Sequence, residues 1–294
     1  MSNTDENTIK IFQQGFNYSQ DGRGNRLVFH LQGCNMHCPW CSNPEGMPIG
    51  GIIMTDQEWL SDNSCPKGNV HNKYLDRSSC LQCDMPCIKL RQKGIHYSCK
   101  NYSLKEIINV CIRSKPMFFD GGGVTLTGGE ISVQFEPVKQ LLIMLGDINI
   151  HRAIESNGSH PRMAELIPLV DQWIMDVKHY NDDIHKKWTG ISNRQVINTL
   201  RAVSEQHEDV LIRIPLIPGF NSDPKDAEGF AELFRHNING DHVSVELLTY
   251  HEFGKSKWAQ CGREYAMQPG KVPPSTVNHF KNILESYGIN VVST

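Results

Sequence analysis

The sequence has no long hydrophobic run, no block of basic residues and no apolar leader. None of its apolar stretches approaches the ~18 residues of a membrane-spanning helix. The first six residues are polar and acidic, so we expect no signal peptide. The 294 residues carry a formal net charge of −3, which gives no footprint for binding phosphates. These absences predict a soluble cytoplasmic protein that has neither nucleic acid nor membrane as a partner.

Ten cysteines in a chain for which we expect no signal peptide indicate metal or cluster ligation rather than disulfides. Three of them, Cys34, Cys38 and Cys41, follow the apolar run 27–31 at the spacing C-x3-C-x2-C. A tight loop at a strand end can direct three thiolates to one point, and thiolates select iron–sulfur clusters, zinc or copper(I). No fourth cysteine lies within this loop. A four-iron cluster with three protein ligands would leave one iron open, whereas structural zinc normally takes four protein ligands.

Short apolar runs alternate with amphipathic segments along most of the chain. The expected strands are 26–31, 124–127, 149–154, 172–177, 210–216 and 243–248. Helical periodicity lies between them, for example after the capping box formed by Ser103 and Glu106. Strands joined by helical crossovers predict a parallel sheet. A closed eightfold barrel usually needs ~250 residues or more. We therefore predict an α/β fold, a partial (β/α)6 open barrel, with its ligands at the carboxyl ends of the strands.

Between residues 55 and 100 the hydrophobic periodicity fades and cysteines accumulate. They are Cys65, Cys80, Cys83, Cys87 and Cys99. The segment has too few apolar residues for a core of its own, so we expect metal to stabilise it. The predicted organisation is an inserted iron–sulfur domain at 55–100 within a barrel domain made of 1–54 and 101–294. A zinc site is the alternative for the insert.

Several ordered motifs resemble those of radical S-adenosylmethionine (SAM) enzymes, and more narrowly the activating enzymes of glycyl radical enzymes. The motifs are Asp21–Arg26, the cysteine loop ending at Glu45, Gly122–Glu130, Asp176–Lys178 and Glu246–Trp258. The resemblance covers nearly the whole chain. Within that group, the chain resembles the pyruvate formate-lyase activating enzymes and has in addition a ferredoxin-like insert.

The resemblance implies that Cys34, Cys38 and Cys41 hold a [4Fe–4S] cluster whose open iron binds SAM, with no further catalytic side chain. It places a set of residues at the cofactor: Trp40, Asn43, Gly128, Gly129, Glu130, Glu155, Ser156, Asp176, Lys178 and His251. Asp21 and Arg213 fall on the side of the partner or substrate. Packing, turn, cap and ion-pair roles are the structural alternatives. The family usually has Asp-Thr where this chain has Glu155 and Ser156, so a monovalent cation beside the cofactor stays open.

The cysteines of the insert resemble a degenerate ferredoxin module. The pattern Cys80-x2-Cys83-x3-Cys87, with Cys65 preceding a proline, favours one auxiliary [4Fe–4S] cluster on Cys65, Cys80, Cys83 and Cys87. Cys99 is the competing fourth ligand. Five cysteines are too few for the two complete sets that many relatives carry.

The implied reaction begins with an electron from flavodoxin or ferredoxin. It cleaves SAM to methionine and a 5′-deoxyadenosyl radical, which removes a hydrogen from a glycine of a partner glycyl radical enzyme. The first alternative is a radical SAM enzyme that acts on a small molecule. The second is an electron-transfer or structural metal protein of the ferredoxin type. No residue identifies the partner enzyme or the oligomeric state.

Overall fold

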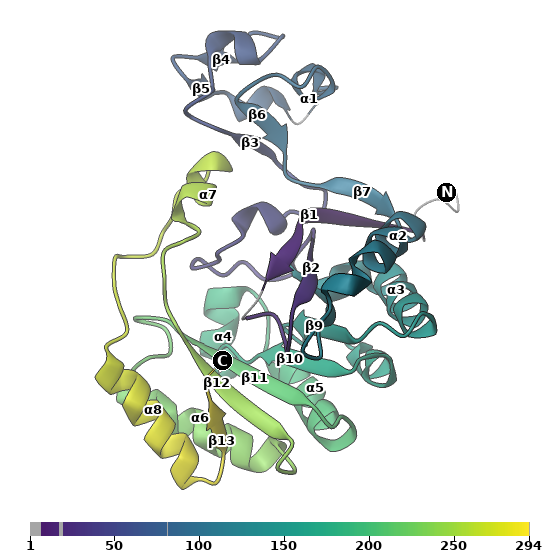
Figure 1. The fold of residues 1–294 in the computed structure, drawn as a ribbon. Coiled ribbons are helices and arrows are strands. Elements are labelled where there is room, and N and C mark those ends of the chain that lie inside the picture. The colour runs from purple at the N-terminus through teal and green to yellow at the C-terminus, as the bar shows by residue number, and fades with distance from the viewer. Residues whose placement is uncertain (1–6, 18–19, 81, 294) are drawn as a thin grey trace.

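A nine-stranded sheet forms the centre of the molecule (Figure 1). The computed structural model describes residues 7–17, 20–80 and 82–293. The strand order is β13-β12-β11-β10-β9-β8-β2-β1-β7. In chain order these strands are β1 (Thr8–Asn17), β2 (Arg26–Leu31), β7 (Lys100–Ser103), β8 (Gly123–Gly128), β9 (Arg152–Ser156), β10 (Gln172–Asp176), β11 (Val210–Leu216), β12 (Val243–Thr249) and β13 (Asn290–Val292).

The six strands predicted from the sequence are all present and are parallel neighbours, from β2 through β8 to β12. β13 extends this parallel sheet at one edge. At the other edge β1 pairs antiparallel with both β2 and β7, so the sheet is mixed. The strand expected at 149–154 lies at Arg152–Ser156 instead. Asn149 has a left-handed backbone (φ 54°) and forms the turn that precedes the strand.

Helices connect the strands and cover the outside of the sheet (Figure 1). The α-helices are α1 (Pro86–Lys89), α2 (Leu104–Ser114), α3 (Phe135–Asp147), α4 (Asp182–Thr189), α5 (Arg194–Gln206), α6 (Pro224–Asn237), α7 (Lys255–Gln260) and α8 (Pro274–Ser286). The short 3-10 turns are η1 (Pro44–Gly46), η2 (Asp62–Ser64), η3 (Arg77–Cys80), η4 (Lys115–Met117), η5 (Ile131–Gln134) and η6 (Met163–Leu169). Within the described ranges no helix is both long and apolar enough to cross a membrane.

The main hydrophobic core lies between the sheet and its helices. Phe29, Leu126, Trp173 and Phe230 are fully buried there, and each such side chain stabilises the fold by about 1.5–3 kcal/mol. The predicted capping box begins α2: the amide of Glu106 donates to the Ser103 hydroxyl at 3.3 Å, and the Ser103 amide donates to the Glu106 carboxylate at 2.7 Å. This core fixes the strand ends that carry the polar residues described below.

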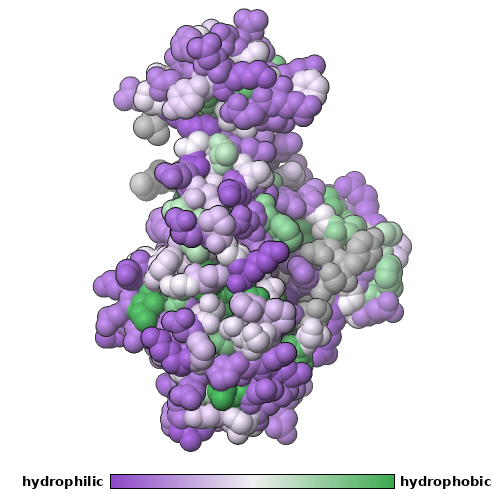
Figure 2. Space-filling view, turned by 90° about the vertical axis from the view of Figure 1, so that its left-hand side faces the viewer, coloured by the Kyte–Doolittle hydropathy of each residue, from purple (hydrophilic) through white to green (hydrophobic). Residues whose placement is uncertain are grey.

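The cysteine-rich segment projects from the rest of the described chain, which carries the nine-stranded sheet and which we call the body (Figures 1 and 2). Two small antiparallel sheets form it, and their strands are β3 (Ile53–Thr55), β4 (Val70–His71), β5 (Tyr74–Leu75) and β6 (Ile95–Tyr97). Its buried apolar residues make a separate small cluster that includes Cys65 and Cys87. The projecting surface is mostly hydrophilic in Figure 2. We call this segment, from Ile53 to Tyr97, the insert.

Candidate functional site

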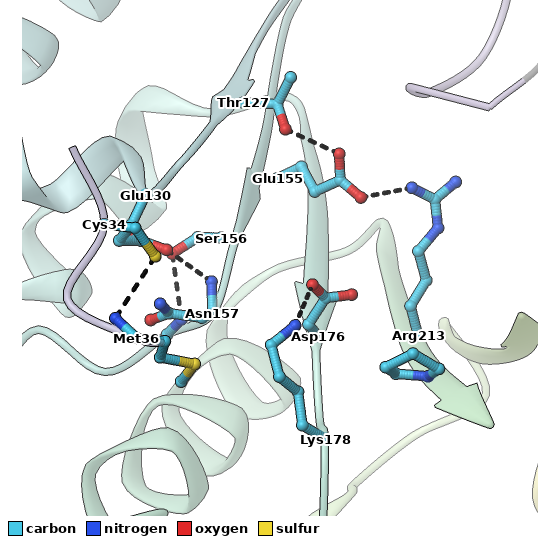
Figure 3. Close-up of polar contacts among 12 residues, drawn as sticks. Cys34, Met36, Thr127, Glu130, Glu155, Ser156, Asn157, Asp176, Lys178 and Arg213 are labelled. Carbon is cyan, nitrogen blue, oxygen red and sulfur yellow. Dashed lines mark hydrogen bonds and ion pairs between the residues drawn. The ribbon is translucent and has the colours of Figure 1, made fainter. Parts of the chain in front are cut away.

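A cavity of about 330 Å³ lies at the carboxyl ends of the parallel strands, beside the cysteine loop. Nearly all the residues predicted for the site line it: Asp21, Cys34, Cys38, Trp40, Cys41, Asn43, Gly128, Gly129, Glu130, Glu155, Ser156, Asp176, Lys178 and Arg213. They come from separate parts of the chain, and the parallel sheet brings them together because its strands end at one edge (Figure 3).

The cysteine loop places its thiols inside this cavity. The amides of Met36 and Asn43 donate to the sulfurs of Cys34 and Cys41, each at 3.4 Å. Burial raises the pKa of Cys34 and of Cys38 to about 12, so without a metal these thiols keep their protons. Buried soft donors whose sulfurs accept backbone hydrogen bonds fit an iron–sulfur cluster, because iron binding replaces the protons.

Two glycines let β8 approach the cysteine loop closely. Gly128 has a φ of +129°, and a Cβ there would lie 2.1 Å from the amide nitrogen of Leu31. A Cβ on Gly129 would lie 2.3 Å from the carbonyl oxygen of Gly33. A side chain at Gly128 would therefore push the end of β8 away from β2, and one at Gly129 would push it away from the start of the cysteine loop.

Glu130 ties the end of β9 to the start of η5. Its carboxylate accepts hydrogen bonds from the hydroxyl of Ser156 at 2.8 Å and from the backbone amide of Asn157 at 2.7 Å (Figure 3). It also accepts one from the backbone amide of Ser132 at 2.9 Å. Glu130 is 1% exposed. Asn157 also donates from its side chain to Asn35 of the cysteine loop at 3.0 Å. The carboxylate of Glu130 thus fixes one wall of the cavity. Glu130 and Ser156, both in this wall, are predicted cofactor contacts.

Arg213 lies between two carboxylates at one side of the cavity. Its guanidinium donates to Glu155 at 2.6 Å (Figure 3). It also donates to Glu246 at 2.8 Å. Burial alone would lower the pKa of Arg213, but the two glutamates raise it above its ordinary value. Thr127 donates to the second oxygen of Glu155 at 2.8 Å, so both oxygens of that carboxylate are bound.

Asp176 and Lys178 form an ion pair at the end of β10. The ammonium lies 2.8 Å from the carboxylate of Asp176 (Figure 3). Burial would lower the pKa of Lys178, but Asp176 and the nearby Cys38 raise it above its ordinary value. The cavity therefore holds a fixed cation beside the thiols, which suits an anionic group of a ligand.

Residues 28–231 match the family model of the radical SAM superfamily. The chain belongs to this superfamily. It is 31% identical to the isethionate sulfite-lyase activating enzyme of Desulfovibrio desulfuricans, over 84% of each chain. It is 28% identical to the 4-hydroxyphenylacetate decarboxylase activating enzyme of Clostridioides difficile, over 92% of this chain and 90% of that protein. Its fold resembles a radical SAM methyltransferase from Sphaerobacter thermophilus (TM-score 0.54, 16% identity, 99% and 74% covered).

The motifs thus predicted the enzyme class correctly. The chain is a radical SAM enzyme of the group that activates glycyl radical enzymes, and its central structure is the mixed α/β sheet of that superfamily. The two relatives named above are activating enzymes for a lyase and for a decarboxylase. Because the partners of these two relatives are enzymes of different types, the similarities do not identify the partner of this chain.

The insert of this radical SAM enzyme brings four cysteines together. Burial raises the pKa of the Cys80 thiol, and so do the neighbouring sulfurs of Cys65, Cys83 and Cys87. Cys99 lies apart from them, packed where a Cβ on Gly51 would come within 2.8 Å of its sulfur. Over the described ranges, no three His, Cys, Asp or Glu side chains are close enough to share a single metal ion. The ligands of a four-iron cluster each bind a different iron.

His251 is the predicted site residue that the structure does not bring to the cavity. It lies on the turn after β12, its side chain is exposed, and its ring stacks on Phe253 with 4.2 Å between centroids. Tyr250 holds this turn because its hydroxyl shares a hydrogen bond of 2.8 Å with that of Tyr265. The motif match located the segment of His251 but could not give the direction of its side chain.

Sequence reasoning missed several residues that build the site. Thr127 lies within the motif Gly122–Glu130 and Asn157 directly follows Ser156, and their side-chain hydroxyl and amide groups gave a signal. His30 lines the cavity from β2, and its position inside an apolar run gave a signal too. Lys257 and Trp258 contact the cysteine loop from α7, and no local pattern indicates which segment they contact.

Proposed function

We propose that this chain activates a partner glycyl radical enzyme, and that its cavity holds SAM against an open [4Fe–4S] cluster on Cys34, Cys38 and Cys41. One observation carries the proposal: the three thiols and the polar ends of β8, β9 and β10 line a single cavity of about 330 Å³. SAM has a carboxylate, an ammonium and an adenine. Fixed charges and hydrogen-bonding groups beside soft thiols suit its amino-acid end.

When bound, the cluster would supply the electron that splits SAM into methionine and a 5′-deoxyadenosyl radical, which takes a hydrogen atom from the partner's glycine. The residues of the chain bind and orient the reactants. Lys178, held by Asp176 at 2.8 Å, offers a cation for the carboxylate of SAM. Glu130 and Ser156 form a polar wall for its ammonium. Trp40 is 8% exposed and offers an aromatic face for the adenine.

Asn43, Gly128, Gly129 and Glu155 complete the proposed cofactor set, because all of them line the same cavity. Asp21 and Arg213 also line it and are proposed for the side that faces the partner. A monovalent cation beside SAM is part of the proposal, and Glu155 is its candidate ligand, because each of its oxygens accepts one hydrogen bond, from Arg213 or from Thr127, and keeps a second lone pair. The predicted contact of His251 would require its turn to move.

We propose further that the sheet acts as a partial (β/α)6 open barrel formed by 1–54 and 101–294, whose uncovered flank admits the glycine loop of the partner. Residues 55–100 would form a ferredoxin-like domain with one auxiliary [4Fe–4S] cluster. Cys65, Cys80, Cys83 and Cys87 are its ligands in this proposal, since their sulfurs lie near one another and Cys99 lies apart. Flavodoxin or ferredoxin would deliver the electron in an anaerobic cytoplasm.

Electron paramagnetic resonance (EPR) on the anaerobically reconstituted, reduced enzyme tests the cofactor site. We expect a reduced-cluster signal that changes when SAM is added and that disappears in Cys38→Ala. Production of 5′-deoxyadenosine should follow the same pattern. A fully iron-loaded protein whose spectrum ignores SAM would refute the proposed site and favour an electron carrier.

The partner is tested by mixing the reduced enzyme and SAM with purified glycyl radical enzymes of the lyase, dehydratase and decarboxylase types. A glycyl radical signal in one of them, with one 5′-deoxyadenosine per radical, is the expected result. Turnover of SAM with a metabolite, and with no radical in any partner, would favour the small-molecule alternative.

A further inference from the structure

The short helix α7 binds the carboxyl-terminal arm of the cysteine loop, residues 41–45. The indole N–H of Trp258 donates to the carbonyl oxygen of Cys41 at 2.9 Å. The ammonium of Lys257 donates to the side-chain oxygen of Asn43 at 2.8 Å and to the carboxylate of Glu45 at 2.6 Å. Glu45 is only 5% exposed, so this ion pair is shielded from water on one side. These contacts hold the arm that carries Cys41.

The other end of α7 is bound by the insert. The guanidinium of Arg77 donates to the carbonyl oxygen of Gln260, the last residue of the helix, at 2.9 Å. It also donates to the carbonyl oxygen of Ile53 at 2.9 Å and to the hydroxyl of Thr55 at 3.2 Å. A cation at the carboxyl end of a helix is favourable because the last carbonyl groups are unpaired. Arg77 begins η3, which ends at Cys80.

Two glycines keep both contacts close. A Cβ on Gly254, just before α7, would lie 2.7 Å from the carbonyl oxygen of Cys41. A Cβ on Gly262, just after α7, would lie 2.0 Å from Nε of Arg77, and Gly262 has a φ of +68°. A side chain at either position would therefore separate the helix from one of its two neighbours.

The hydrophobic clusters of the body and of the insert are separate, so apolar packing does not join them as one core. The polar contacts of Arg77 with α7 therefore have a large share in setting where the insert lies. A continuous series of contacts runs from Cys80 through η3 and Arg77 to α7, and from Trp258 to Cys41.

We propose that α7 couples the insert to the cysteine loop, and that Arg77, Lys257 and Trp258 are positioning residues for the open-cluster site. The consequence for SAM cleavage rests on the proposed function, but the coupling itself does not. A movement of the insert would shift α7 and loosen the arm of Cys41. The geometry of the two cysteine groups would then be linked although no cysteine of one touches the other.

The test follows the loss of iron from the reconstituted full-length enzyme in an excess of chelator and iodoacetamide. Mass spectrometry of the alkylated cysteines separates the two groups: Cys34, Cys38 and Cys41 report on the loop, and Cys83 reports on the insert. We expect Trp258→Phe and Lys257→Met to speed alkylation of the loop cysteines about fivefold, the effect of losing one net hydrogen bond. The rate at Cys83 should stay unchanged in both variants.

Arg77→Met gives the decisive result. Coupling predicts that alkylation of the loop cysteines also becomes about threefold faster, although Arg77 touches none of them. Gly262→Ala should act in the same direction because it displaces an intact Arg77. Lys93→Met is the matched control, since Lys93 is an exposed cation of the insert that contacts the ring of Trp59 and not α7.

Coupling is overturned if Arg77→Met and Gly262→Ala leave the loop cysteines at the wild-type rate, or if Lys93→Met changes that rate equally. The readout does not depend on catalysis. A protein whose EPR signal ignores SAM but whose alkylation follows the predicted pattern would refute the proposed function and support the coupling. A protein whose EPR signal responds to SAM but whose alkylation does not follow the predicted pattern would support the proposed function and refute the coupling.

Discussion

The body and the insert both bring cysteines together, but the apolar clusters that surround those cysteines differ in size. In the body, Cys38 lies against a large core that contains Phe29, Leu126 and Trp173, and the sheet positions the thiol. In the insert, Cys65 and Cys87 are themselves members of a small apolar cluster. A small domain with few apolar residues relies on its metal for stability, whereas a large one does not. If both cysteine groups hold clusters as proposed, the same ligand chemistry would serve reactivity in one region and folding in the other.

The largest expected effect separates reactivity from folding in the body. Cys38→Ala should abolish SAM cleavage and remove the irons of the proposed open cluster, because only three protein ligands would hold it. The body should stay folded, at a cost of about 1–2 kcal/mol, because the core remains. Iron analysis, EPR and thermal unfolding measure these effects.

Cys111→Ala is the matched control for that variant. Cys111 is fully buried on α2, away from the cavity, so the substitution should cost similar stability and leave both clusters and the activity intact. Global unfolding of Cys38→Ala would contradict the comparison, because the thiol would then support the body as well.

The comparison also explains what the sequence could predict. The parallel strands β8 and β10 are short runs with apolar or β-branched residues at their centres, buried on both faces, so local composition located them. β1 mixes polar and apolar residues and lies near the edge of the sheet, so it gave no such signal. The thiols of the loop were predictable because one short segment contains all of them.

The contacts between distant segments were not predictable in the same way. Glu130 binds Ser156, and Arg213 binds both Glu155 and Glu246, only because the strands end side by side. The separation of Cys99 from the cysteines of the insert likewise follows from the path of the chain and not from spacing.

The second-largest expected effect is local unfolding of the insert. Cys83→Ala should remove the irons of the proposed auxiliary cluster and unfold the insert locally, so that limited proteolysis cuts within 55–100 while the body stays intact. Cys99→Ala should keep its irons and resist the protease. If Cys99→Ala lost iron and Cys65→Ala kept it, Cys99 and not Cys65 would be the fourth ligand.

The third effect destabilises the body without touching the insert. Arg213→Met leaves Glu155 and Glu246 without their shared cation in a buried place, which should cost about 3–5 kcal/mol in urea unfolding. Adding Glu246→Gln should recover part of that loss. Arg235→Met is the control, because its side chain is 53% exposed and its pair with Glu232 is worth about 0–1 kcal/mol. Equal effects for the two arginines would contradict the buried ion-pair model.

The smallest effect concerns acid stability of the body. Burial, with help from Lys257, lowers the pKa of His30 from 6.5 to about 4. Between about pH 4 and pH 6.5, His30 therefore binds a proton in the unfolded chain but not in the folded chain. Stability from a neutral His30 is complete above pH 6.5 and is lost as the pH falls toward 4, by about 1.4 kcal/mol per pH unit. Urea unfolding of the cluster-free chain at pH 7 and pH 5.5, followed by tryptophan fluorescence, measures this loss.

His30→Phe should make the stability of the body less dependent on pH. The phenyl ring can keep the contact with Phe12, whose ring centroid lies 5.5 Å from that of His30, but it cannot bind a proton. The variant should lose about 1 kcal/mol less than the wild type over this pH step. His236→Phe, at an exposed position of α6, should behave like the wild type. Equal losses in wild type and His30→Phe would show that His30 is not buried neutral in the body, and the acid sensitivity would then have to come from other groups.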